Sequence, residues 1–168
     1  MHPYGQRTYG KGAMQAFYEL EDGSYLKLTV GHFFGPSGTV INHVGINPTV
    51  TTTSNPLYQA HYDTIKEQLT NSKELASLKN VPLNKTFTIN FSKQLATTVD
   101  INAVQLIELG GNAVETTIKV SDQKLLITPK NSLAAGKEYM LIVQPTIKNS
   151  NGKAIKQGVH LHITTVAK

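Results

Sequence analysis

A glycine-flanked lysine near the start of the sequence is the first feature whose residue types and spacing could do chemistry. Gly5-Gln6-Arg7-Thr8-Tyr9-Gly10-Lys11-Gly12 has the spacing of a phosphate-binding loop. Such a loop needs a serine or threonine after the lysine and a buried strand before it, whereas Gly12 follows Lys11 and only Met1–Tyr4 precede Gly5. The sequence therefore argues against nucleotide binding, and from spacing alone Lys11 is an exposed loop lysine.

A longer pattern around this lysine resembles the carboxyl-terminal processing (tail-specific) serine peptidase family. Four blocks in one order carry the resemblance: Tyr9–Gln15, Leu20–Thr29, Gly35–Gly38 and Gly45–Pro48. They cover under a third of the chain, and Thr49 departs from the family, in which an acid usually follows the proline. Because these blocks form the end of the family's catalytic core, the resemblance implies Ser-Lys proteolysis near unstructured protein C-termini.

The resemblance assigns Lys11 as the general base and Gln15 as the residue that orients it. A serine hydroxyl becomes a good nucleophile when a neighbour accepts its proton, and a lysine accepts a proton only as the neutral amine. Burial or positive surroundings favour that neutral form, and Gly10 and Gly12 would let the backbone approach the amine closely. If the residues after Lys11 form one helical turn, Gln15 lies on the same side and can hydrogen-bond the amine.

The family's nucleophilic serine lies on a helix well upstream of the lysine, further than the start of this sequence. Ser24 and Ser37 fall at positions that match other parts of the pattern. The PDZ domain and most of the peptidase core also lie outside these 168 residues. We therefore expect a carboxyl-terminal peptidase piece that is inactive alone, and its exposed apolar strands lead us to expect a homo-oligomer.

Turn and hydrophobic patterns divide the chain into residues 1–54, 55–79 and 80–168. In residues 1–54, Ser24–Val30 alternates between apolar and polar residues and predicts a half-buried strand. Asp22-Gly23 predicts a hairpin turn that joins this strand to the run around Phe17, and Thr39–Ile41 is a further strand-like run.

Residues 55–79 are predicted to form a helical connector. Asn55-Pro56 is a helix start, and an apolar stripe at helical spacing follows, made of Tyr58, Tyr62, Ile65 and Leu69. Thr70-Asn71-Ser72 should end the helix, and a short helical turn through Leu75 and Leu78 is expected after it. We expect the stripe to pack on one neighbouring surface.

Residues 80–168 contain a series of short strands separated by turns, which predicts a β-sandwich. The expected strands are Phe87–Phe91, Val104–Leu109, Val114–Val120, Lys124–Thr128, Glu138–Gln144 and Val159–Thr165. This region resembles the bacterial Ig-like domains of surface-layer and envelope proteins. The residues that carry this resemblance are Phe87–Ser92, Lys124–Pro129, Leu133–Tyr139 and Asn149–Lys153.

The fold class expected is mainly β with a connecting helix: an incomplete peptidase-core β segment plus an Ig-like β-sandwich. The Ig-like resemblance implies an extracytoplasmic parent, secreted or attached to the cell envelope, in which such modules act as spacers or adhesive units. No apolar run is long enough to span a membrane, no signal-peptide core is present, and the absence of cysteine excludes disulfides and thiolate metal sites.

The net charge of +5 comes entirely from the last half of the chain, where ten lysines and five acids follow Asn80. This excess suits an anionic cell-wall polymer, the alternative function that we carry forward. No arginine occurs there, which argues against nucleic acid.

His160 and His162 share one face of a predicted strand, but no third metal ligand is identified, so we expect solvent-facing histidines and neither metal nor cofactor.

Overall fold

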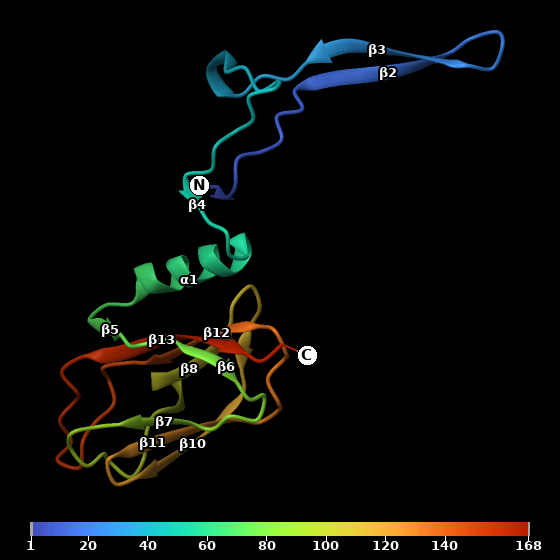
Figure 1. Ribbon diagram of the computed structural model, residues 1–168. Helices are drawn as coiled ribbons and strands as arrows, with labels where there is room; N and C mark the ends of the chain where they lie inside the picture. The colour runs from blue at the N-terminus through green and yellow to red at the C-terminus, as the bar shows by residue number, and fades with distance from the viewer. Residues whose placement is uncertain (1, 168) are drawn as a thin grey trace. The chain divides into compact units, whose positions relative to one another are not determined.

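Extended strands make up most of the regular structure in residues 2–167, the part of the chain that the computed structural model describes. The chain divides after Pro56 into two compact units, which we call the N-terminal unit (residues 1–56) and the sandwich unit (residues 57–168). The sequence-based connector, residues 55–79, therefore does not stand apart, because nearly all of it belongs to the sandwich unit. The fold class, mainly β with one connecting helix, is confirmed (Figure 1).

The N-terminal unit is built around one long hairpin. Its elements are β1 (Tyr4–Gly5), β2 (Ala13–Glu19), β3 (Tyr25–His32), a 3-10 turn (Pro36–Gly38) and β4 (Val50–Thr51). Strands β2 and β3 pair antiparallel, and β1 pairs with β4 in parallel. The segment Thr39–Ile41, expected to be strand-like, forms only an isolated bridge between Val40 and Phe34.

The Asp22-Gly23 turn closes the hairpin as the sequence predicts. The Ser24 hydroxyl and N–H both donate to the Asp22 carboxylate, at 2.6 and 2.9 Å, and together they hold its pKa below the usual value. Gly23 supplies the positive φ of +80°. The expected half-burial of β3 is wrong for this unit, since Leu26, Leu28 and Val30 are each 45–49% exposed.

The sandwich unit has three layers (Figure 1). Helix α1 (Pro56–Gln68) covers one face of a six-stranded sheet, and a three-stranded sheet packs on the other face. The six-stranded sheet has the order β5-β13-β12-β8-β9, with β6 also beside β13. Its strands are β5 (Ser72–Glu74), β6 (Leu78–Val81), β8 (Val104–Glu108), β9 (Ala113–Val114), β12 (Glu138–Val143) and β13 (Gly158–Thr165).

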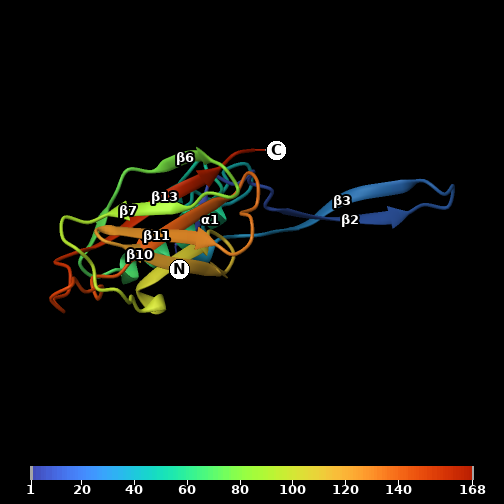
Figure 2. The same ribbon diagram turned by 90° about the horizontal axis from the view of Figure 1, so that it is seen from below.

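The second sheet has the order β10-β11-β7, and Figure 2 shows β11 between the other two strands. Its strands are β7 (Phe87–Asn90), β10 (Thr116–Ser121) and β11 (Lys124–Pro129), and a 3-10 turn (Ile101–Ala103) precedes β8. The expected single strand Val114–Val120 is two strands, because β9 pairs with β8 in one sheet and β10 pairs with β11 in the other. Glu115 lies where the chain crosses between the sheets.

The principal core lies between the two sheets. Leu125 and Ile127 of β11 face it with 0% exposure, and Tyr139, Leu141 and Ile163 of the six-stranded sheet meet them from the other side. A second cluster lies under α1, where the predicted stripe of Tyr58, Tyr62, Ile65 and Leu69 packs on Leu109, Met140 and Ile142. The helix and its packing stripe are therefore as predicted.

Two short strands occupy the place of the helical turn expected through Leu75 and Leu78. β5 and β6 both pair in parallel with β13, along the same side of that strand. Asn71, with φ of +53°, ends the helix region and turns the chain onto the sheet. The prediction was wrong because the pairing that fixes these residues comes from β13, almost ninety residues later in the sequence.

Neighbouring leucines on opposite faces of β11 test this packing. Leu125 is fully buried, whereas Leu126 points away from the core opposite Lys119. We expect Leu125→Ala to lower the free energy of unfolding by about 2–5 kcal/mol, since it removes buried methyl groups and leaves a cavity. Leu126→Ala should cost much less. Urea unfolding followed by circular dichroism measures both, and equal losses would contradict the assigned faces.

Candidate functional site

The segment that bears Lys11 is held by backbone contacts with residues 41–46. The Thr8 N–H donates to the Ile46 carbonyl at 3.0 Å, and the His43 N–H donates to the Gly10 carbonyl at 2.8 Å. The Gly12 N–H donates to the Asn42 side-chain oxygen at 3.1 Å. Lys11 therefore lies between two anchored residues, and the position of its backbone is set on both sides.

The two glycines beside Lys11 are required by close backbone approach. Gly10 has φ of +83°, and a Cβ there would lie 2.6 Å from the Gly45 nitrogen. At Gly12 a Cβ would lie 2.6 Å from the Asn42 nitrogen. Any larger residue would push residues 41–46 away, so this sequence pattern follows from packing as well as from chemistry.

Lys11 and Gln15 line the same shallow depression in the N-terminal unit. The other lining residues are Tyr9, Gly10, Ala13, Thr29, His32, Asn42 and His43. The side chains of Lys11 and Gln15 are both exposed, and no hydrogen bond joins them in the described part of the chain. Neither Ser24 nor Ser37 is among the lining residues.

Gln15 reaches the depression by a different route from the expected helical turn. Residues 13–19 form strand β2, in which Gln15 pairs with Thr29 of β3. A register shift between Met14 and Gln15 interrupts the alternation there. The helical-turn expectation was wrong because residues 13–19 pair with β3 across the hairpin, a constraint that a one-turn spacing argument ignores.

His32, Asn42 and His43 are lining residues that the sequence alone did not single out. His43 has φ of +60°, and the turn that places it is closed by hydrogen bonds from the Val44 and Gly45 N–H groups to the Ile41 carbonyl. No residue spacing signals this arrangement, since it depends on how the loop folds back on Gly10. The phosphate-loop alternative finds no support, because strand β2 and no helix follows Gly12.

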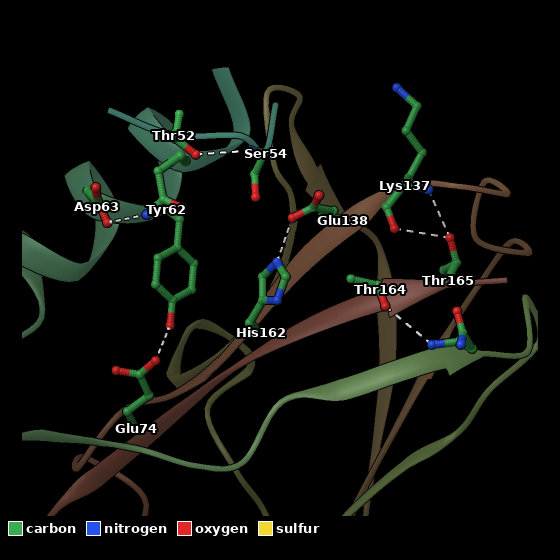
Figure 3. Close-up of polar contacts among 12 residues, drawn as sticks. Thr52, Ser54, Tyr62, Asp63, Glu74, Lys137, Glu138, His162, Thr164 and Thr165 are labelled. Atoms are coloured by element: carbon green, nitrogen blue, oxygen red, sulfur yellow. Dashed lines mark hydrogen bonds and ion pairs between the residues drawn. The ribbon is translucent and has the colours of Figure 1, made fainter. Parts of the chain in front are cut away.

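A second polar cluster lies under α1 in the sandwich unit. His160 is 3% exposed, and its Nδ1 lies 2.8 Å from the Ser72 hydroxyl. His162 Nε2 lies 2.7 Å from the Glu138 carboxylate (Figure 3). The two histidines do share a face, but the expectation of a solvent-facing ring is wrong for His160, which α1 covers, while His162 is partly exposed. Among the described residues, no group of three or more potential ligands could hold a metal ion.

Comparison with known proteins assigns the sandwich unit. Residues 63–165, more than half of the chain, match the family described as bacterial Ig-like domain. The chain belongs to the bacterial Ig-like domain family. Ig-like domains of this kind are typical of extracytoplasmic proteins, and the described residues include no helix that is long and apolar enough to cross a membrane. A crystal structure of the N-terminal part of the bacterial S-layer protein SbsC is 17% identical with a TM-score of 0.43, and covers 64% of this chain and 26% of that one.

Residues 3–52, which precede the Ig-like domain, match Peptidase family S41. Carboxyl-terminal-processing peptidase 2 of Arabidopsis thaliana, a chloroplastic protein, is 49% identical over 45 residues, which are 27% of this chain and 9% of that protein. A probable CtpA-like serine protease of Staphylococcus aureus (strain COL) is 44% identical over 57 residues, which are 34% of this chain and 11% of that protein. The chain thus spans about a tenth of the length of these curated relatives.

Two glycines with similar φ and different surroundings test the anchoring of Lys11. We expect Gly10→Ala to open the contact between residues 8–12 and 41–46, because its Cβ meets backbone atoms. Gly23→Ala has a similar φ of +80° and nothing within 4 Å, so it should cost only the conformational strain of about 1–2 kcal/mol. Amide hydrogen exchange at Thr8 and His43 reports the opening. If the Thr8 and His43 amides of Gly10→Ala stayed as protected as in the wild type, the contact would have room for a Cβ and the prediction would be wrong.

Proposed function

We propose that the N-terminal unit supplies the general base, Lys11, of a serine peptidase that cleaves proteins near unstructured C-termini. The observation that carries this proposal is the anchored, glycine-flanked backbone at Lys11, which presents its side chain to the depression that Gln15 also lines. The match of residues 3–52 to Peptidase family S41 supports it.

In the proposed reaction, Lys11 accepts the proton of a serine hydroxyl that another part of the peptidase core contributes. The serine oxygen then attacks the scissile carbonyl and forms an acyl-enzyme, while the proton passes to the leaving amine. Water hydrolyses the acyl-enzyme and restores the serine. Gln15 is a positioning residue, whose amide would hold the Lys11 amine toward the serine.

The exposed apolar residues of the N-terminal unit fit an element that packs against such a core. Phe17, Tyr25, Phe33 and Phe34 are 53–65% exposed, which is a large apolar surface for so short a segment. We propose that the remainder of the peptidase core covers this surface and excludes water from Lys11. Without that core, the same residues would promote self-association.

A chimeric enzyme tests whether Lys11 acts as the general base. Residues 3–52 would replace the matching segment of the Staphylococcus aureus CtpA-like serine protease, and cleavage of an unstructured peptide would be measured. We expect Lys11→Ala to reduce kcat/KM by roughly 10²–10⁴-fold, the range for loss of a positioned acid or base. Lys11→Arg should not restore activity, since a guanidinium does not release its proton. Gln15→Ala should have a smaller effect.

Lys27→Ala is the matched control, because Lys27 lies on the hairpin over the Phe17 ring and not in the depression. It should change kcat/KM far less than Lys11→Ala does. The 168-residue chain by itself should not cleave the peptide. An active Lys11→Ala chimera would rule out the proposed base.

The Ig-like domain supports a second candidate function, attachment to an anionic cell-wall polymer. The outward face of the three-stranded sheet carries Lys119 and Lys124, while its remaining outward positions are threonine, serine, asparagine and leucine. No acidic side chain lies at those strand positions. Such a face would attract a polyanion, and the attraction would weaken in salt.

Replacement of lysines on this face tests the attachment. We expect Lys119→Gln with Lys124→Gln to weaken binding to purified cell wall several-fold, and high salt to abolish wild-type binding. Lys130→Gln with Lys137→Gln removes the same charge from lysines that already pair with Glu115 and Glu108, so it should weaken binding less. Pull-down at two salt concentrations measures both. Salt-independent binding would contradict the electrostatic mechanism.

A further inference from the structure

Helix α1 is attached to the six-stranded sheet through an interface that mixes apolar residues with histidines. Tyr62 lies at the centre, with its ring edge-on to His162 at 5.6 Å and tilted against His160 at 6.5 Å. Apolar contact alone would hold the helix equally at any pH. A buried histidine in such an interface can make the attachment sensitive to protons, because imidazole is the side chain that ordinarily titrates between about pH 5 and 8.

His160 is buried beneath the helix in a site that suits only the neutral ring. It is 3% exposed, its Nδ1 contacts the Ser72 hydroxyl, and its Nε2 is buried with no hydrogen-bond partner among the described residues. Protonation would place a positive charge on this ring. Burial disfavours that charge and lowers the pKa of His160 below its ordinary value of 6.5.

The charged groups around His160 compensate only in part. The Glu74 carboxylate on β5 lies 3.9 Å from Nε2, but it already accepts from the Lys66 amine at 2.7 Å. It also accepts from the Tyr62 hydroxyl at 2.8 Å (Figure 3). These two hydrogen-bond donors lower the pKa of Glu74, and Lys66 has the larger effect. The Glu74 carboxylate is therefore already stabilised by partners other than His160. Lys66 on α1 also repels a protonated His160.

A second histidine joins the helix to a turn of the six-stranded sheet. His61 on α1 accepts a hydrogen bond at Nδ1 from the Gly110 N–H, at 2.9 Å, in the turn between β8 and β9. This bond ties α1 to the sheet in addition to the apolar stripe.

We propose that α1 is an acid-released helix, held to the sheet while the buried His160 is unprotonated and freed when it takes up a proton. For His160 the sign follows from linkage. With a folded-state pKa below 6.5, the released state binds more protons between the two values, so attachment is strongest above pH 6.5 and weakens as the pH falls.

His162 is the internal counterexample. Its Nε2 lies 2.7 Å from the Glu138 carboxylate, and both residues belong to the sheet, on β13 and β12. His162 Nε2 thus already has a carboxylate partner within the sheet, whereas the buried Nε2 of His160 has no hydrogen bond among the described residues. This pairing makes His162 the matched control for His160, two residues away on the same face.

Amide hydrogen exchange on the full 168-residue chain tests the proposal. Exchange of α1 amides would be followed from about pH 8 to about pH 5, after correction for intrinsic exchange, with β12 amides as the internal reference. We expect the opening equilibrium of wild-type α1 to rise on acidification, by at most about tenfold per pH unit for each proton taken up, while β12 stays protected.

Glutamine replaces each histidine with a side chain that hydrogen-bonds but does not titrate. His160→Gln should abolish the pH dependence. His162→Gln should keep the wild-type pH dependence. A His160→Gln variant that still loses α1 protection in acid, or a wild-type helix whose protection is constant with pH, would overturn the proposal.

A direct titration of the wild-type protein guards against variants that fail to fold. The ring proton signals of His160, followed by NMR against pH, should give a pKa below 6.5. A value above 6.5 would reverse the linkage and overturn the proposal regardless of the variants.

Discussion

The burial of the six-stranded sheet on both faces is the constraint from which the rest of the sandwich unit follows. One face packs on the three-stranded sheet, and the other packs on α1. A strand in the middle of such a sheet has no solvent face, so β12 reads as a nearly continuous apolar run after Glu138. Each polar residue admitted to these faces must then find a partner, and among the described side chains the buried Nε2 of His160 is the exception.

The N-terminal unit follows a different principle, because backbone contacts and not a buried core define it. Gly10, Gly12 and Gly45 allow two loop segments to approach within hydrogen-bonding distance, and Lys11 stands between those contacts. Most of the large apolar side chains of this unit remain exposed. A short segment can thus present a fixed lysine backbone while most of its large apolar side chains stay exposed.

The elements that the sequence predicted well are those whose signals are local. The Asp22-Gly23 turn, the stripe on α1 and the strands of the sandwich each depend on residues within one element. The misassigned ones depend on distant partners. Leu75 and Leu78 lie in or beside strands that pair with β13, and Gln15 lies in a strand that pairs with β3. A spacing rule cannot report a partner that lies elsewhere in the chain.

The candidate sites divide in the same way. Lys11 and Gln15 could be named because a family pattern spans them, and the structure finds them at one depression. Their catalytic roles stay predictions. His32 and His43 reach that depression through loop geometry, and the burial of His160 follows from the helix above it, so neither could be read from residue types.

The edge strands of the six-stranded sheet have a consequence for how copies of this domain meet. On one border β9 offers only two residues, and on the other β13 is screened by two separate short strands with an irregular register. A neighbouring chain that tried to extend the sheet would find no long ladder of free backbone groups to copy. The six-stranded sheet therefore offers no edge along which a second copy of the domain could readily extend it.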